Sequence, residues 1–215
     1  MNLKRVLMNI LLIESNAFFR GHVVQALSQG LTQAQVQAFE RGLPVLARCD
    51  LAPLPDLVLI SLEQVDVNVF DFIEQLRRRC PQLPLLALAM NANDPALLRA
   101  LQSGASGYVF KADSAAEICA SVQHALDGQY WLCPQMARMI LALPSPSGAH
   151  ASDALNPREV VTLNMLSQSQ GLDTLGELMN QAPSVVQGII RQVYQKLRTH
   201  PHAALPKAVT AGGEV

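Results

Sequence analysis

Short apolar runs alternate with stretches of helical periodicity over the first two thirds of the chain. The apolar runs lie at residues 9–13, 35–39, 56–61, 84–89 and 108–110, and the helical patterns lie at residues 16–28, 43–49, 69–79, 95–102 and 114–126. Repeated strand-then-helix units of this kind are typical of a parallel sheet with helices on both faces. The pattern predicts a doubly wound α/β domain with five parallel strands.

The pattern changes at residues 144–153, where apolar periodicity stops and Pro, Ser and Gly accumulate as in a linker. Beyond this segment the periodicity is purely helical, at residues 156–167, 172–179, 183–198 and, more weakly, 203–210. Asn156 followed by Pro157 is a good helix start, and Pro183 repeats the signal. The sequence therefore predicts an α/β domain with a trailing helix over residues 1–143, a linker over 144–153 and an all-α four-helix domain over 154–215.

The composition is that of a folded protein with aliphatic cores. Of its 215 residues, 50% are hydrophobic and 15% are charged, which excludes a disordered chain and allows two compact domains. No apolar run reaches the ~18 residues that cross a bilayer, so we expect no membrane partner. The four cysteines, Cys49, Cys80, Cys119 and Cys133, lack close pairing and metal-ligand spacing. We therefore expect free thiols in a cytoplasmic protein, with no metal and no other cofactor.

The net charge of −1 gives no general preference for nucleic acid. Residues 154–215 hold five Lys or Arg and four acidic residues, a balance of only +1. Any binding of DNA by the C-terminal domain must therefore depend on where individual charges lie.

The functional crevice of an open parallel sheet lies at the carboxyl ends of its strands. The first predicted strand ends there in Glu14 and Ser15, the third in Ser61 and the fourth near Ala89, and the fifth leads into Lys111. We expect these side chains to gather at one edge of the sheet. A lone lysine beside a glutamate more often forms a structural ion pair than a catalytic site, and we expect this of Lys111 and Glu14.

Five short motifs occur in the order and spacing of one known architecture. They are I-L-L-I-E-S-N-A-F-F-R from residue 10, P-D-L-V-L-I-S-L from 55, G-A-S-G-Y-V-F-K-A-D from 104, L-N-P-R-E from 155 and V-Y-Q-K-L from 193. Residues from about 9 to 130 resemble the receiver domain of a two-component response regulator, and residues from about 154 to 212 resemble a LuxR-type helix-turn-helix. Together they resemble the NarL/FixJ group over nearly the whole chain.

The chain departs from this family where the receiver chemistry resides. In the family, two acidic residues after the first strand and an aspartate after the third hold Mg²⁺, and that aspartate accepts a phosphoryl group. Ser15 and Ser61 stand at two of these three positions, and neither is the carboxylate that an acyl phosphate or Mg²⁺ requires. The family's phosphate-bonding Ser/Thr aligns with Ala89, whereas Tyr108 and Lys111 are retained.

The resemblance therefore implies a degenerate phosphorylation pocket that works independently of aspartyl phosphorylation. Its five positions are Glu14, Ser15, Ser61, Ala89 and Lys111. No nucleophile and base pair occurs elsewhere, so we expect no catalytic residue and no enzymatic activity.

The helix predicted at 183–198 resembles the recognition helix of the family. Its apolar stripe must be buried, and it consists of Val185, Val186, Ile189, Ile190, Val193, Tyr194 and Leu197. We expect Ser184, Gln187, Gly188 and Arg191 to face the major groove, where Gln187 suits an adenine edge and Arg191 a guanine edge. Residues nearer the C-terminal end are expected to contact phosphates, and these are Lys196, Arg198 and Lys207.

The sequence thus predicts a homodimeric transcriptional regulator that binds double-stranded DNA. One alternative is a regulator that has lost strong DNA binding and acts on a second regulatory protein. Another is a cyclic di-GMP-responsive regulator, because some degenerate receivers of this group bind that ligand through a W-[FLM]-[ST]-R motif. The matching residues here are Trp131, Leu132, Cys133 and Pro134, so the arginine is replaced. Pro134 is a good helix start, and we expect Trp131 to pack against the helices that flank the sheet.

Overall fold

A five-stranded parallel sheet forms the centre of the N-terminal part of the protein. The computed structural model describes residues 7–48, 54–143, 155–168 and 181–199. The strands lie in the order β2-β1-β3-β4-β5, which confirms the predicted doubly wound fold. Their bounds are β1 Met8–Ile13, β2 Ala34–Phe39, β3 Leu57–Ser61, β4 Leu85–Ala89 and β5 Gly107–Phe110.

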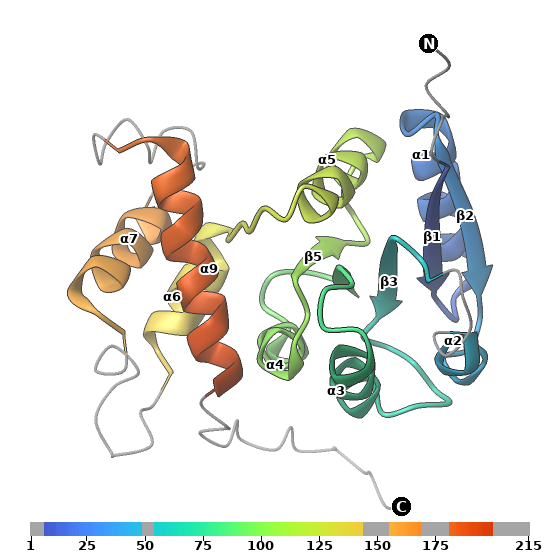
Figure 1. Cartoon of the computed structure of the whole chain (residues 1–215), viewed down its shortest axis with the longest axis horizontal. Coiled ribbons are helices and arrows are strands. Elements are labelled where there is room, and N and C mark those ends of the chain that lie inside the picture. Colours follow the sequence, from blue (N-terminus) through green and yellow to red (C-terminus); the bar gives the residue numbers. More distant parts are fainter. Residues whose placement is uncertain (1–6, 49–53, 144–154, 169–180, 200–215) are drawn as a thin grey trace, which may run out of the picture.

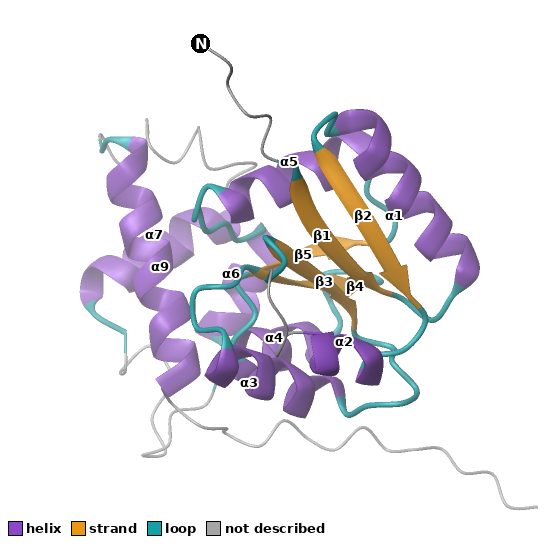
Figure 2. Ribbon diagram, turned by 45° about the vertical axis from the view of Figure 1, so that its right-hand side comes forward, coloured by secondary structure: helices purple, strands orange, loops and turns teal. Residues whose placement is uncertain are grey.

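Five helices cover the two faces of this sheet (Figures 1 and 2). One face packs against α1 (Ala17–Gly30) and α5 (Ala115–Leu126). The other packs against α2 (Leu43–Arg48), α3 (Val69–Arg79) and α4 (Pro95–Ser103). Each helix lies within a few residues of its predicted position, because the apolar periodicity that predicts it is also the pattern that it buries.

Side chains of alternate strand residues pack against opposite helical layers. Ile10 and Leu12 of β1 join the core under α1 and α5, whereas Leu11 and Ile13 join the core under α3 and α4. Every residue of β3 and β4 is buried, because both strands are central and covered on both faces. The protein therefore has two helix-on-sheet cores that share the central strands.

Polar caps start the helices at the carboxyl edge of the sheet. The side chains of Asn16, Asn68, Asp94 and Ser114 each accept a hydrogen bond from a backbone N–H of the first turn that follows. Ser114 forms a reciprocal capping box with Glu117. These caps fix where the chain turns from β1, β3, β4 and β5 into helices, and so they shape the edge where the candidate site lies.

Three further helices form a group beside the β5 edge of the sheet: α6 (Pro134–Leu141), α7 (Pro157–Gln168) and α9 (Pro183–Thr199). The apolar stripe of α9 is buried from Val186 to Leu197, as predicted, while Val185 is half-buried. Helices predicted at 172–179 and 203–210, and the linker predicted at 144–153, lie outside the described residues. The four-helix composition and the domain boundary therefore stay predictions.

The helical group and the α/β part of the protein share one apolar core. Helix α6 packs against α7, α7 packs against α9, and α9 packs in turn against α4. Leu101 and Tyr108 belong to the same buried cluster as Val193 and Leu197 of α9. Helix α9 is therefore packed against the α/β part of the protein as well as within its own group.

Candidate functional site

The five positions of the predicted degenerate pocket do follow the carboxyl ends of the strands. Glu14 and Ser15 follow β1, Ser61 ends β3, Ala89 ends β4 and Lys111 follows β5. Glu14, Ser61, Ala89 and Lys111 are buried, and Ser15 is half-buried.

A buried ion pair occupies this edge. The Lys111 Nζ lies 2.9 Å from Glu14 Oε2, and the exposed fractions of the two side chains are 1% and 0%. The same Nζ lies 2.8 Å from Glu63 Oε2, whose side chain is 58% exposed. The ammonium group also faces the Phe19 ring, with 4.9 Å between Nζ and the ring centroid. The predicted pairing of Lys111 with Glu14 is confirmed, and the lysine is balanced by two carboxylates.

Glu63 was not among the residues that sequence reasoning selected. It lies in the loop after β3, where it accepts from Lys111 and where its backbone N–H donates to Ser61 Oγ at 3.3 Å. Its backbone carbonyl accepts from Ser15 Oγ at 3.4 Å. The sequence does contain a feature that could have identified Glu63: it is an acidic residue two positions after the end of a strand, at the same edge of the sheet as Lys111. The two serines at the family's acidic positions thus bond to the Glu63 backbone.

The residues at this edge do not fit a bound Mg²⁺. Of the two carboxylates, Glu14 has Oε2 beside Lys111, and its Oε1 accepts from the Asn16 N–H at 2.8 Å. The Glu63 carboxylate also forms an ion pair with Lys111. Serine hydroxyls that bond to backbone groups do not replace the missing carboxylates. Over the described part of the chain, no group of three or more His, Cys, Asp or Glu side chains is arranged to hold a metal ion.

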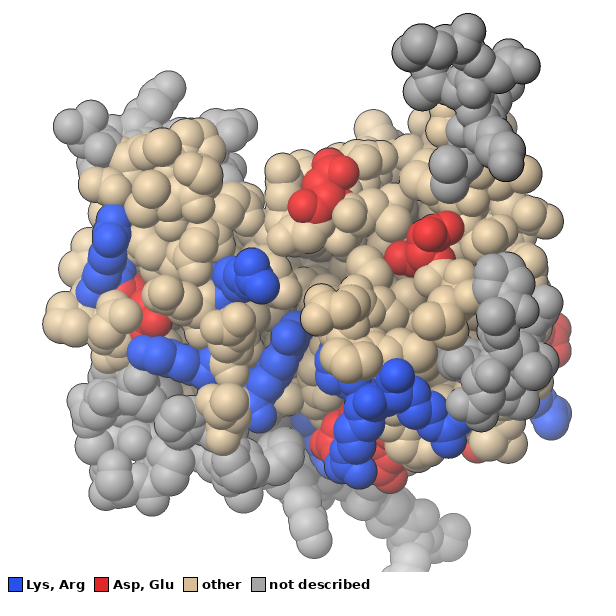
Figure 3. Space-filling model, in the orientation of Figure 1, with Lys and Arg blue, Asp and Glu red and all other residues tan. Residues whose placement is uncertain are grey.

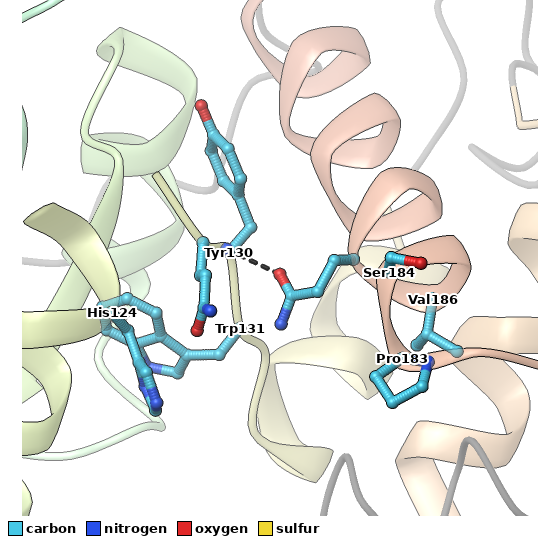
Figure 4. A pocket seen from close by; sticks show the side chains of 8 residues that line it. His124, Tyr130, Trp131, Pro183, Ser184 and Val186 are labelled. Atoms are coloured by element: carbon cyan, nitrogen blue, oxygen red, sulfur yellow. Dashed lines mark hydrogen bonds between the residues drawn. The ribbon is translucent and has the colours of Figure 1, made fainter. Parts of the chain in front are cut away.

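In the N-terminal half of α9, some side chains are exposed to solvent and one forms a hydrogen bond within the protein. Ser184, Gly188 and Arg191 are exposed, as predicted. The expectation that Gln187 also faces solvent is wrong: it is half-buried, and its Oε1 accepts from the Tyr130 N–H at 2.8 Å. Figure 4 shows this hydrogen bond between α9 and the connection from α5 to α6. In this arrangement the amide oxygen of Gln187 is used within the protein.

The C-terminal half of α9 is also held by specific contacts. Lys196 Nζ lies 2.7 Å from Glu159 Oε2 of α7, a carboxylate that is almost fully buried. Arg198 Nη2 donates to the Ala105 carbonyl at 3.0 Å, in the loop between α4 and β5. Both residues were predicted to contact phosphates, and in this structure both have partners inside the protein. Lys207 lies outside the described residues.

Tyr194 fixes the middle of α9 to the receiver. Its hydroxyl donates to the Trp131 carbonyl at 2.8 Å, and its ring meets the Tyr130 ring at a centroid distance of 5.0 Å. Burial raises the pKa of Tyr194 well above its usual value, so the hydroxyl stays protonated and remains a donor. Gln187, Tyr194 and Arg198 are seven and four residues apart, so they share the side of α9 that faces the receiver.

Trp131 packs against β5 and α5, as predicted. A Cβ at Gly107 of β5 would lie only 2.7 Å from the Trp131 ring, so only glycine allows this approach. The ring also meets the rings of Tyr108 and His124, at centroid distances of 5.8 and 5.9 Å. Tyr108 is buried as well, and its hydroxyl accepts from the Cys133 N–H. Both Trp131 and Tyr108 are therefore packing residues in this structure.

A cavity of about 470 Å³ lies between this connection and the start of α9 (Figure 4). His124, Trp131 and Ser184 are among the residues that line it, and none of the described lining residues is Lys or Arg. Cyclic di-GMP carries two negatively charged phosphates, which this lining leaves without a cation. Pro134 begins α6, where the motif for that ligand has arginine. Both observations count against the cyclic di-GMP interpretation.

Two general expectations from the sequence concern thiols and membranes. Cys80, Cys119 and Cys133 are free thiols, as predicted, and Cys49 lies outside the described residues. None of the helices in the described segments is long and apolar enough to cross a bilayer.

The sheet order β2-β1-β3-β4-β5 with helices on both faces is that of a receiver domain, although the side chains at its carboxyl edge differ. Residues 10–123 match the family described as the response regulator receiver domain. These residues are more than half of the chain, so the chain belongs to the response regulator receiver family.

Several known proteins are similar over most of the chain. Transcriptional activator protein ExaE of Pseudomonas putida is 25% identical over 209 residues, which are 95% of this chain and 97% of that protein. Response regulator GacA of Pseudomonas viridiflava is 28% identical over 146 residues, 66% of this chain and 68% of that protein. The solved structure of the Salmonella typhimurium RcsB response regulator covers 89% of this chain and 92% of its own, with a TM-score of 0.55 and 15% identity. That likeness shows the fold, and it extends over the receiver and the helical group.

Proposed function

We propose that the protein is a transcriptional regulator of the NarL/FixJ kind that binds DNA through α9 and works without phosphorylation of its receiver. The main observation in favour of independence from phosphorylation is the environment of Lys111. This lysine is held between Glu14 and Glu63, and the position of the phosphoryl acceptor is occupied by Ser61. A phosphoryl group would find no carboxylate at the acceptor position, and the lysine beside it is already paired with two carboxylates.

The receiver acts by binding and not by catalysis. The buried Ser61 hydroxyl accepts from the Glu63 N–H, which is a donor and not a base. A serine hydroxyl needs an adjacent base to become a nucleophile. We therefore assign no enzymatic activity to this edge.

Treatment with acetyl phosphate, or with beryllofluoride, in the presence of Mg²⁺ tests the proposal chemically. We expect no phosphate adduct in the intact mass and no change in oligomeric state. Ser61→Asp alone should not restore full switching, because Ser15 still lacks a carboxylate and Ala89 still lacks the phosphate-bonding hydroxyl. An adduct at near stoichiometry on the unaltered protein would overturn the proposal.

The exposed residues at the start of α9 support the DNA-binding half of the proposal. Ser184, Gly188 and Arg191 are exposed on the first turns, the part of a recognition helix that enters the major groove. The similar protein ExaE is named a transcriptional activator, and the solved RcsB structure is described in terms of DNA interaction. These relatives support the same assignment for the helical group of this chain.

A gel-shift series against genomic fragments at two salt concentrations tests DNA binding. Specific binding should survive competitor DNA and weaken as salt rises. Arg191→Ala should relax preference at one base pair of each half-site, at a cost of about 1 to 3 kcal/mol for that contact. If this variant keeps both affinity and base preference in a selection-and-sequencing assay, Arg191 does not read bases.

We propose further that the protein is a homodimer without any modification. Regulators that read paired half-sites do so as two-fold dimers. Because this receiver lacks a phosphoryl switch, we expect its dimer to form constitutively. Light scattering at micromolar concentration should report the dimer with and without beryllofluoride. A monomer under both conditions and on DNA would contradict this expectation.

A second candidate function is a regulator that binds another protein. The contacts of Gln187 and Arg198 with the receiver favour it, because they occupy two residues that DNA binding was expected to use. The same gel-shift series separates the two functions, since this candidate gives no specific shift on any fragment.

A further inference from the structure

Basic side chains are concentrated on three neighbouring helices, α3, α4 and α9. These helices hold seven Lys or Arg and two acidic residues, a net charge of +5, in a chain whose total is −1. The seven are Arg77, Arg78, Arg79, Arg99, Arg191, Lys196 and Arg198. The net charge of the whole chain is therefore near zero although one region, formed by helices of the receiver and of the helical group, is strongly basic.

The three helices lie side by side, with α4 in contact with both α3 and α9. Arg99 of α4 lies over the Phe70 ring of α3, with 4.1 Å between its guanidinium carbon and the ring centroid. Figure 3 shows Lys and Arg gathered across the lower part of one face, from the helical group to α3. We call five of these residues the basic band: Arg77, Arg78, Arg99, Arg191 and Arg198.

The loop after α4 connects the receiver arginines of the basic band to those of α9. Gly104 ends α4 with φ of 121°, a backbone conformation that favours glycine. Arg77 of α3 donates to the Gly104 carbonyl at 2.8 and 3.0 Å, and Arg198 of α9 donates to the next carbonyl, that of Ala105, at 3.0 Å. Two guanidinium groups, one from the receiver and one from the helical group, are thus held on consecutive residues of one turn.

The positive charge at this turn is not balanced within the described residues. Neither Arg77 nor Arg198 has a carboxylate partner there, and Arg198 Nε is buried without a hydrogen-bond acceptor. Burial lowers the pKa of Arg77, and the nearby charge of Arg198 lowers it further. On the exposed part of the band, Arg78 pairs with Glu74 at 3.2 Å, near the surface, where solvent weakens the attraction. An anion brought to this surface gains attraction without competing with a strong internal pair.

We propose that the exposed receiver arginines of the basic band, Arg78 and Arg99, bind the sugar-phosphate backbone of double-stranded DNA, so that α3 and α4 of the receiver extend the contact made by α9. This inference rests on the proposed function. A row of arginines on three adjacent helices suits a ladder of regularly spaced phosphates better than a single small anion, and exposed guanidinium groups such as those of Arg78 and Arg99 bind phosphates bidentately. Arg77 and Arg198, whose donors hold the carbonyls of the turn after α4, add positive charge beside them. It also supplies the charge that residues 154–215, with a balance of +1, lack.

The test compares the salt dependence of DNA binding among single variants of the full chain. Fluorescence anisotropy with a labelled random-sequence duplex of about 30 base pairs, roughly three helical turns, gives the dissociation constant at several KCl concentrations. Each phosphate contact contributes a slope of about 0.9 in log K against log salt. We expect Arg78→Ala and Arg99→Ala each to reduce the slope by about 0.9, and Arg78→Lys and Arg99→Lys to keep it.

Arg41→Ala is the matched control, because Arg41 is exposed on the receiver but follows β2, at the opposite edge of the sheet from α9. Its slope should equal that of the unaltered protein. If Arg191→Ala weakens binding while Arg78→Ala and Arg99→Ala leave the slope unchanged, the proposed function stands and the basic band is not a DNA surface. If the unaltered protein binds no DNA, the proposed function fails and this inference fails with it.

Discussion

At the scale of single residues, Lys111 is a structural cation, as its position beside Glu14 predicted. Its partner Glu14 is fully buried, so removing the lysine leaves a carboxylate without a counter-charge. Lys111→Met should therefore lower the free energy of unfolding by about 3 to 5 kcal/mol in urea denaturation. The double variant Glu14→Gln/Lys111→Met, which buries no charge, should recover part of this loss.

Glu63→Gln is the comparison for this pair. Its side chain is mostly exposed, so the change should cost less than about 1 kcal/mol. If Lys111→Met is as stable as the unaltered protein, the ion pair has no structural role.

A second residue-scale prediction concerns Gly107. A Cβ there would lie 2.7 Å from the Trp131 ring and 3.1 Å from a Leu86 methyl, so Gly107→Ala should cost about 1 to 3 kcal/mol by overpacking. The chain has one tryptophan, so a shift in its fluorescence emission reports the displacement directly. Gly21→Ala in α1 meets nothing within 4 Å and should stabilise the protein by up to about 1 kcal/mol. Equal effects of the two changes would contradict the packing described for Trp131.

At the scale of elements, Lys196 holds α9 to the start of α7. Glu159 accepts from Lys196 and also caps α7, where its Oε2 accepts from the Asn156 N–H at 2.7 Å. Lys196→Met leaves a buried carboxylate without its cation and should cost about 1 to 3 kcal/mol in thermal or urea unfolding. Gln195→Ala, an exposed neighbour on α9, should stay within about 0.5 kcal/mol. Unchanged stability of the Lys196 variant would leave the phosphate role first expected of it as the better account.

Periodicity predicted the helix and its buried stripe, but not which neighbour each side of α9 faces. The apolar residues from Val186 to Leu197 give the same pattern whether α9 packs on one neighbour or on two. Gln187 and Arg198 therefore looked like solvent-facing residues, whereas both bond to receiver backbone. The spacing of Gln187 and Arg198 from Tyr194, a large buried residue with a polar end, could have indicated that all three face the same neighbour. Sequence position alone does not reveal contacts between elements that are far apart in the chain.

At the scale of the whole molecule, the sheet was predictable because a parallel order follows from repeated strand-then-helix units. The edge residues Glu14, Ser61 and Lys111 were predictable for the same reason, since strand ends meet at one edge. Glu63 was not, because its position depends on the path of a loop. The charge distribution was missed as well: counting by domain gave near neutrality, whereas α3, α4 and α9 together carry +5.

DNA binding by this protein should not depend on the chemistry of the receiver edge. The most direct measurement is the dissociation constant for one DNA duplex, by fluorescence anisotropy at fixed salt, with and without beryllofluoride and Mg²⁺. We expect the same dissociation constant in both conditions, because Ser61 offers no acyl-phosphate site and Lys111 is already paired. A change in affinity of about tenfold or more, equal to about 1.4 kcal/mol, would contradict it.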